Sequence, residues 1–154
     1  MKPDLDKLLS SKDANGAIIE LDDYICGLCS WGKELDKLTG PQKNFYFNQN
    51  LEREINNGGF NQYFFNSAGS HAAETVVSLK TIGANITAEI VQSAIDQFPS
   101  QIAPANRTVR QEILEQISEQ ANPVWSGLDE RFLAYTENLS ALNLEYVRNN
   151  KNAF

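Results

Sequence analysis

The sequence has only two cysteines, one histidine and thirteen basic residues against twenty acidic ones, and each shortage excludes a class of protein. Two cysteines cannot build a disulfide-rich scaffold. A formal net charge of −7 argues against general binding to nucleic acid or anionic lipid, because both require clustered lysine and arginine. The apolar runs are far shorter than the roughly 18 residues that a membrane-spanning helix needs. A partner with a basic surface is compatible with this charge.

The length of 154 residues and the 42% share of hydrophobic residues fit one folded domain. The first residues include Asp4 and Asp6, where a signal peptide would be apolar. We therefore expect a cytoplasmic protein in a reducing compartment, with Cys26 and Cys29 as free thiols.

The spacing of apolar residues predicts an all-α fold, a single compact domain of about seven or eight short helices with short connections. One helix is expected over 17–38. The next begins near Pro41, where Thr39 and Gln42 fit a capping box, and ends at the turn-forming pair Gly58-Gly59. Pro123 is expected to lie beyond the end of a later helix. Further helix starts are predicted at four potential capping residues, Ser70, Thr87, Thr108 and Ser126.

Carboxylates gather on the helix that is predicted to begin at Thr108. At 100° per residue, Glu112, Glu115 and Glu119 fall within about 60° of one another, opposite the apolar residues of the same helix. They are expected to form an outward acidic stripe of about 10 Å, along which duplex DNA would present about six charges. Imitating a duplex would thus need a second acidic face. The other candidates for a partner-binding acidic surface are Asp22, Asp23, Asp129 and Glu130.

Signals for catalysis are weak. Cys26 and Cys29 form a CxxC, but the helical spacing around them favours ordinary small apolar positions over a redox pair, and the nearby Asp22 and Asp23 would oppose thiolate formation. His71, the one histidine, is interpreted as a surface or capping residue, and Glu54 as an acceptor for nearby backbone amides. Phosphate-binding, HExxH and GxSxG motifs are absent, and zinc needs about four ligands, so we expect no catalytic residue, metal or cofactor.

The segment from Glu54 to Ser67 is distinctive. It resembles the signature E-x-x-N-G-G-F-x-Q-Y-F-x-N-S of the bacterial DNA mimic protein 19 family, and flanking features such as Leu79–Ala84 and Leu128–Phe132 are also similar. The resemblance covers roughly residues 40–150, and residues 1–38 are interpreted as an N-terminal helical extension packed on the same domain, 1–154. The residues that carry the signature are Glu54, Asn57, Gly58, Gly59, Phe60, Gln62, Tyr63, Phe64 and Asn66.

The resemblance implies an all-helical domain without known catalytic residues or cofactor. For the protein after which the family is named, the resemblance also implies an acidic surface that occupies the DNA-binding face of a transcription factor. We interpret the signature as a structural corner that carries Phe60, Tyr63 and Phe64 into the core. We therefore predict a non-enzymatic acidic protein that binds a basic surface of another protein. In the most specific form of this prediction, the protein regulates a DNA-binding protein by DNA mimicry. We expect no direct binding to nucleic acid or to a membrane. The alternative is a module that binds a protein or a small ligand through apolar and aromatic surface.

Overall fold

The structure, a computed structural model, describes residues 1–154 and contains only α-helices, short 3-10 turns and loops. The expected all-α fold is therefore confirmed. No helix of this structure has both the length and the apolar character needed to cross a lipid bilayer. The helices are α1 (Leu5–Leu9), α2 (Ala14–Leu28), α3 (Gly40–Phe65), α4 (Ala72–Thr81), α5 (Asn85–Ile95), α6 (Arg107–Leu133) and α7 (Leu139–Asn149), and the 3-10 turns are Leu35–Lys37, Ser67–His71, Pro99–Gln101 and Lys151–Ala153.

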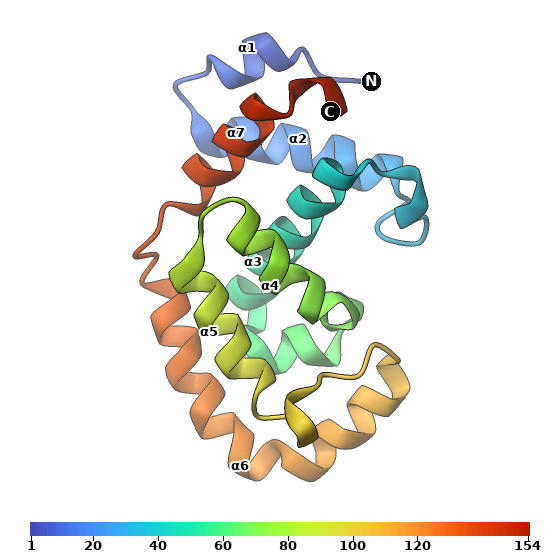
Figure 1. Ribbon diagram of the computed structural model, residues 1–154, viewed down its shortest axis with the longest axis vertical. Helices are drawn as coiled ribbons and strands as arrows, with labels where there is room; N and C mark the ends of the chain where they lie inside the picture. The colour runs from blue at the N-terminus through green and yellow to red at the C-terminus, as the bar shows by residue number, and fades with distance from the viewer.

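The apolar core has two parts. A cluster of 23 buried residues joins α3, α4, α5 and α6. A second cluster of 13 buried residues connects α1, α2 and the first turns of α3 with helix α7 and the C-terminal residue. In Figure 1, α1, α2 and α7 form the upper end of the molecule, and α6 curves around the lower end. Helix α3 connects the two parts, because its first half packs into the smaller cluster and its second half into the larger one.

Helix α2 is shorter than the sequence predicted. It is capped by Asp13, whose carboxylate accepts a hydrogen bond from the Gly16 amide at 2.9 Å, and it ends at Leu28. After the C-cap residue Cys29, the residues Ser30, Trp31 and Gly32 have φ angles of 50°, 57° and 92°. The expectation of one helix over 17–38 is therefore wrong: left-handed backbone ends the helix, and the apolar spacing beyond it belongs to a turn and a 3-10 segment.

Helix α3 begins as predicted. The Thr39 hydroxyl accepts a hydrogen bond from the Gln42 amide at 3.2 Å, and the Gln42 side chain accepts one from the Thr39 amide at 3.0 Å, which completes the capping box. The C-terminal residue Phe154 packs edge-on against Phe45, with 6.0 Å between ring centroids. The start of α3 is thus fixed both by its own cap and by the end of the chain.

Helix α6 is longer than predicted because Pro123 does not end it. Proline inside a helix costs about 3 kcal/mol, since it removes one backbone hydrogen bond. The buried residues Ala121, Trp125, Leu128 and Phe132 follow one another at helical spacing on both sides of the proline. Burying them stabilises the helix by more than the proline costs, at roughly 1.5–3 kcal/mol for each large side chain. Ser126 consequently lies inside α6 and does not cap a helix.

Two other predicted caps, Thr87 and Ser70, bond to distant side chains and do not cap their helices. Thr87 lies in the first turn of α5, and its amide and hydroxyl both donate to the Glu137 carboxylate, at 2.7 and 2.8 Å. Ser70 lies in a 3-10 turn, where its hydroxyl accepts from Arg110 at 3.1 Å. Both residue types can cap helices locally, but here tertiary contacts use them differently.

The predicted capping box of Thr108 is also wrong. Asn106 caps α6 by accepting from the Val109 amide at 3.0 Å, and Asn138 caps α7 in the same way. Asparagine is as good a cap as serine or threonine, and the helix starts two residues earlier than the Ser/Thr pattern indicates.

Candidate functional site

The glycine pair forms a corner within α3. Gly59 has φ 73° and ψ −169°, a conformation that is almost restricted to glycine, and it separates Gly40–Gly58 from a last helical turn and a half, 60–65. The Phe60 amide, which would lack a partner after the break, donates to the Asp129 carboxylate of α6 at 2.8 Å. A side chain at Gly59 would collide with that carboxylate. The corner therefore needs both a glycine and an acid from another helix.

The other signature residues brace this corner. The Glu54 carboxylate accepts from the side-chain amides of Gln62 and Asn66, each at 2.9 Å, so it joins the two halves of the broken helix. Glu54 is thus an acceptor, as expected, although its partners are side chains. Asn57 and Gly58 are exposed. The aromatic residues Phe60, Tyr63 and Phe64 are at most 1% exposed and lie in the larger core cluster, which confirms that the signature packs the core.

A buried arginine completes the end of α3. Arg110 of α6 is fully buried, and its guanidinium donates to the backbone carbonyls of Phe64, Asn66 and Pro104 at 2.6, 2.7 and 2.8 Å. A cation is favoured at a helix C-terminus because the last carbonyls have no partner within the helix. Sequence reasoning missed this role, because Phe64 and Asn66 lie 46 and 44 residues away along the chain.

The acidic stripe lies on α6. Glu112, Glu115 and Glu119 are all exposed, and none takes part in a side-chain hydrogen bond or an ion pair. The stretch Gln111–Glu130 holds five acidic residues and no lysine or arginine. The stripe therefore presents three uncompensated charges along about 10 Å of helix surface.

The remaining acidic candidates are not equivalent to the stripe. Glu130 is exposed on α6, whereas Asp129 of the same helix is occupied by the corner. Asp22 and Asp23 lie on α2, which Figure 1 places at the upper end of the molecule, away from the first half of α6 at the lower end. Asp23 is exposed, but Asp22 forms an ion pair with Arg53. The structure thus brings Glu130 onto the helix of the stripe and separates Asp22 and Asp23 from it.

A family model described as DMP19-like protein matches residues 36–150 of the chain. The chain belongs to the DMP19-like protein family. This confirms the resemblance that was inferred from the glycine corner. No curated protein and no solved structure matches the chain in the corresponding comparisons. The matched range includes α3 to α7 with both the corner and the stripe, and it begins after α1 and α2.

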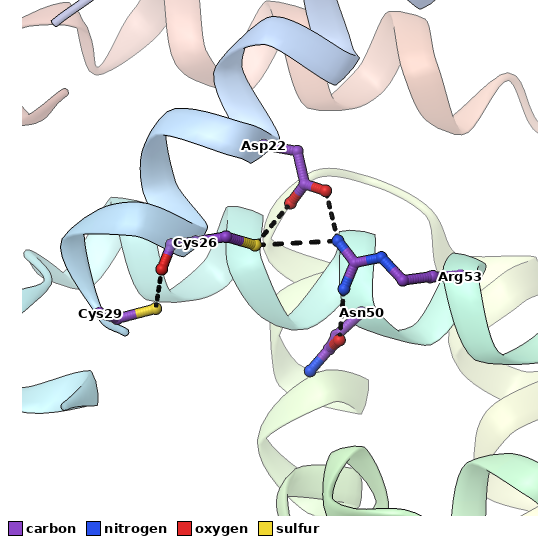
Figure 2. Close-up of polar contacts among 5 residues, drawn as sticks. All are labelled: Asp22, Cys26, Cys29, Asn50 and Arg53. Carbon is purple, nitrogen blue, oxygen red and sulfur yellow. Dashed lines mark hydrogen bonds and ion pairs between the residues drawn. The ribbon is translucent and has the colours of Figure 1, made fainter. Parts of the chain in front are cut away.

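The two cysteines of this DMP19-like chain are buried and free, as expected. Figure 2 shows the Cys26 thiol between the Asp22 carboxylate, which accepts from it at 3.5 Å, and the Arg53 guanidinium at 3.8 Å. Burial, followed by the charge of Asp22, raises the pKa of Cys26 to about 12. The Cys29 thiol points to the Cys26 carbonyl at 3.6 Å. A thiol that stays protonated is a poor nucleophile, so these contacts do not favour redox chemistry.

His71 is held by packing. Its ring stacks on Phe47 with 5.0 Å between centroids, and it makes no side-chain cap to α4. Burial lowers the pKa of His71. Ser67 and His71 line the same small cavity of about 250 Å³, but no hydrogen bond joins their side chains. No cluster of three or more His, Cys, Asp or Glu side chains is arranged to hold a metal ion.

Sequence reasoning did not single out Glu52, an unusual carboxyl on α3. Burial raises its pKa to about 7, and a hydrogen bond with Tyr135 only partly offsets this effect. One oxygen, Oε1, is buried without a hydrogen-bond partner. A single Glu in a helical pattern looks like any solvated residue, so only the packing of α2 and the loop before α7 identifies this position.

Proposed function

We propose that this DMP19-like protein is a non-enzymatic acidic protein whose helix α6 binds a basic surface of another protein. The observation that carries the proposal is the stripe of three exposed, unpaired glutamates within a stretch of twenty residues that has no basic side chain. Such a surface attracts lysine and arginine without internal competition.

DNA mimicry is the more specific form of this proposal. The family name supports it, and the charge spacing is compatible with it: three charges in about 10 Å equal what one DNA strand presents over the same length. A DNA-binding protein that contacts a phosphate backbone is therefore the partner class that we propose for the stripe.

The proposal that the protein is not an enzyme rests on the contacts that the candidate catalytic groups make within the fold. Cys26 has a raised pKa, His71 is stacked on Phe47, and Glu54 is occupied by two amides. Each group is thereby committed to packing or to internal hydrogen bonds.

The test compares two triple variants with equal charge. Glu112→Gln/Glu115→Gln/Glu119→Gln removes the stripe, and the control Asp36→Asn/Glu74→Gln/Glu89→Gln removes three exposed carboxylates elsewhere. Proteins retained by the immobilised chain are purified, and their affinity is measured by calorimetry with and without competing duplex DNA. At about 0.2–1 kcal/mol for each exposed pair, the stripe variant should bind roughly 3- to 150-fold more weakly than the native chain.

Duplex DNA should displace the partner from the native chain, and added salt should weaken the complex. The control variant should bind almost like the native chain. If both variants lose affinity equally, α6 is not the binding surface. If DNA and the chain bind the partner together, α6 does not act as a DNA mimic.

A further inference from the structure

A small cavity lies between the loop after α2, the first half of α3 and the 3-10 turn Ser67–His71. Its volume is about 250 Å³, below the roughly 300–1,000 Å³ of sites for drug-sized ligands, so only a small molecule fits. The residues that line it are Trp31, Gly32, Lys33, Leu35, Tyr46, Asn50, Ser67 and His71. None of them belongs to α6, so the cavity is separate from the acidic surface proposed above.

The loop after α2 is held close to α3 and forms one wall of the cavity. Trp31 and Gly32 have φ angles of 57° and 92°, and a side chain at Gly32 would collide with the Tyr46 hydroxyl. The Trp31 amide donates to the Cys26 carbonyl at 2.8 Å, which ties the loop back to the end of α2. This wall of the cavity is therefore fixed by the backbone.

The polar side chains that line the cavity can all donate hydrogen bonds. Lys33 and Ser67 are exposed, and neither side chain makes a hydrogen bond or an ion pair within the chain. The side-chain oxygen of Asn50 already accepts from Arg53 at 2.8 Å, as Figure 2 shows, so the Asn50 amide hydrogens are left to donate. The unpaired polar atoms that are sealed inside this fold belong to other residues, so these donors are accessible to a ligand.

The cavity has one cation and no carboxylate, although the chain has twenty acidic residues against thirteen basic ones. The acid next to Lys33 in the sequence, Glu34, is occupied by Lys37 at 2.8 Å and by the Ser30 hydroxyl. An unpaired ammonium beside neutral donors favours an anion, because hydrogen bonds between charged groups are roughly twice as strong as neutral ones. A carboxylate matches one lysine better than a phosphate, which carries up to about two charges.

Trp31 supplies a flat apolar surface next to these donors. It is 64% exposed, and the Arg53 guanidinium lies 5.8 Å from the centroid of its ring. Arg53 does not line the cavity, so the cavity borders a part of the ring that the guanidinium leaves free. Aromatic rings pack on one another with centroids about 4.5–7 Å apart, and Leu35 offers a second apolar contact.

We propose that this cavity binds a small aromatic carboxylate, a single ring with a short acid, as in phenylacetate. The carboxylate accepts hydrogen bonds from Lys33 and Ser67, with the Asn50 amide as a further donor. The ring packs on Trp31 beside Leu35.

Nuclear magnetic resonance of the ¹⁵N-labelled full chain, titrated with sodium phenylacetate at constant pH and ionic strength, tests the proposal. The indole signal of Trp31 should shift. That of Trp125 should not, because Trp125 is 1% exposed and its indole donates to the Ala94 carbonyl. The expected Kd is about 10 mM or lower, as for other ligands of about ten non-hydrogen atoms.

Three further probes separate the contacts. Phenylacetamide has no charge and should bind about fivefold or more weakly than phenylacetate. Cyclohexylacetate keeps the acid but has no aromatic ring, and it should bind about 2- to 12-fold more weakly. Inorganic phosphate should also bind more weakly than phenylacetate, and an equal or higher affinity for phosphate would overturn the assignment to an aromatic carboxylate.

Variants assign the contacts, with the Gly32 amide signal as the readout. Lys33→Gln should weaken phenylacetate binding by about fivefold or more, whereas the control Lys80→Gln, which removes an exposed lysine from α4, should not. Trp31→Leu should abolish the preference for phenylacetate over cyclohexylacetate, an effect that a purely structural role of Trp31 would not produce. Circular dichroism checks that each variant is folded.

Two results would overturn the proposal. The first is that phenylacetate at about 10 mM shifts no signal of the lining residues. The second is that Lys33→Gln binds phenylacetate as tightly as the native chain does. In either case the cavity holds only water.

Discussion

Glu52 makes the stability of this fold depend on pH in a direction opposite to that of most carboxylates. Burial raises its pKa from an ordinary value near 4.5 to about 7. A carboxyl group that holds its proton more tightly in the folded chain than in the unfolded chain stabilises the fold only while it is protonated. Its contribution is therefore complete below about pH 4.5 and is lost as the pH rises through 7.

The size of the effect follows from the two pKa values. The difference between about 4.5 and about 7 corresponds to about 3 kcal/mol, at about 1.4 kcal/mol for each pH unit. Typical domains are stable by only about 5–15 kcal/mol, so this change is large enough to measure. The cause is the burial of Glu52, and the neighbouring Arg53 does not offset it because it is already paired with Asp22.

Urea denaturation of the native chain and of Glu52→Gln, followed by far-ultraviolet circular dichroism, measures this contribution. Glutamine has the same shape and cannot ionise. Between pH 4.5 and 8, the free energy of unfolding of the variant should therefore rise by up to about 3 kcal/mol relative to that of the native chain. The control Glu20→Gln, on the exposed side of α2, should keep the native pH dependence. Parallel stability curves for the native chain and Glu52→Gln would refute the argument.

Three further variants or measurements test the structure. Gly59→Ala should lower the free energy of unfolding by about 2–4 kcal/mol in urea titrations, because of its positive φ and the collision with Asp129; an unchanged midpoint would contradict the corner geometry. Arg110→Met should cost about 3 kcal/mol or more in the same assay, since at least two buried carbonyls lose their donor, and a loss below about 1 kcal/mol would show that water replaces the guanidinium. Cys26 and Cys29 should react with a thiol reagent at pH 8 only as fast as the fold opens, and rapid labelling of the native chain would contradict their burial.

The all-helical fold could be predicted because helix signals are local. Three signals in α3 each depend on residues within one or two helical turns. They are the capping box of Thr39 and Gln42, the glycine pair at 58–59, and the apolar spacing between the box and the pair. The stripe was predictable for the same reason, since Glu112, Glu115 and Glu119 share a face by spacing alone. Such signals hold whenever nothing distant competes with them.

Predictions failed where a distant residue replaced a local one. Thr87 was expected to cap a helix that Glu137 caps instead, and Pro123 was expected to end a helix that the burial of Trp125 and Leu128 extends. Left-handed backbone at Ser30 and Trp31 had no sequence signal at all. At Thr87 and Pro123, tertiary contacts outweigh a local preference of about 1–3 kcal/mol.

The same competition decides which carboxylates are available to a partner. Asp13 caps α2, Asp22 pairs with Arg53, Asp129 caps the corner and Glu137 caps α5, so each is committed to the fold.

A count of twenty acidic residues therefore overstates the surface that a basic partner would meet. Carboxylates on α6 such as Glu112, Glu115 and Glu119 have no competing partner within the chain. An exposed charge that no internal group neutralises loses least when a basic partner arrives, because no existing ion pair has to break. On this reasoning neutralising Asp22 should weaken the fold near Arg53 and leave partner affinity almost unchanged, whereas neutralising the stripe should do the reverse. Measuring urea stability and partner affinity on both variants separates structural from functional acids, and a stripe variant that loses stability but not affinity would reverse the assignment.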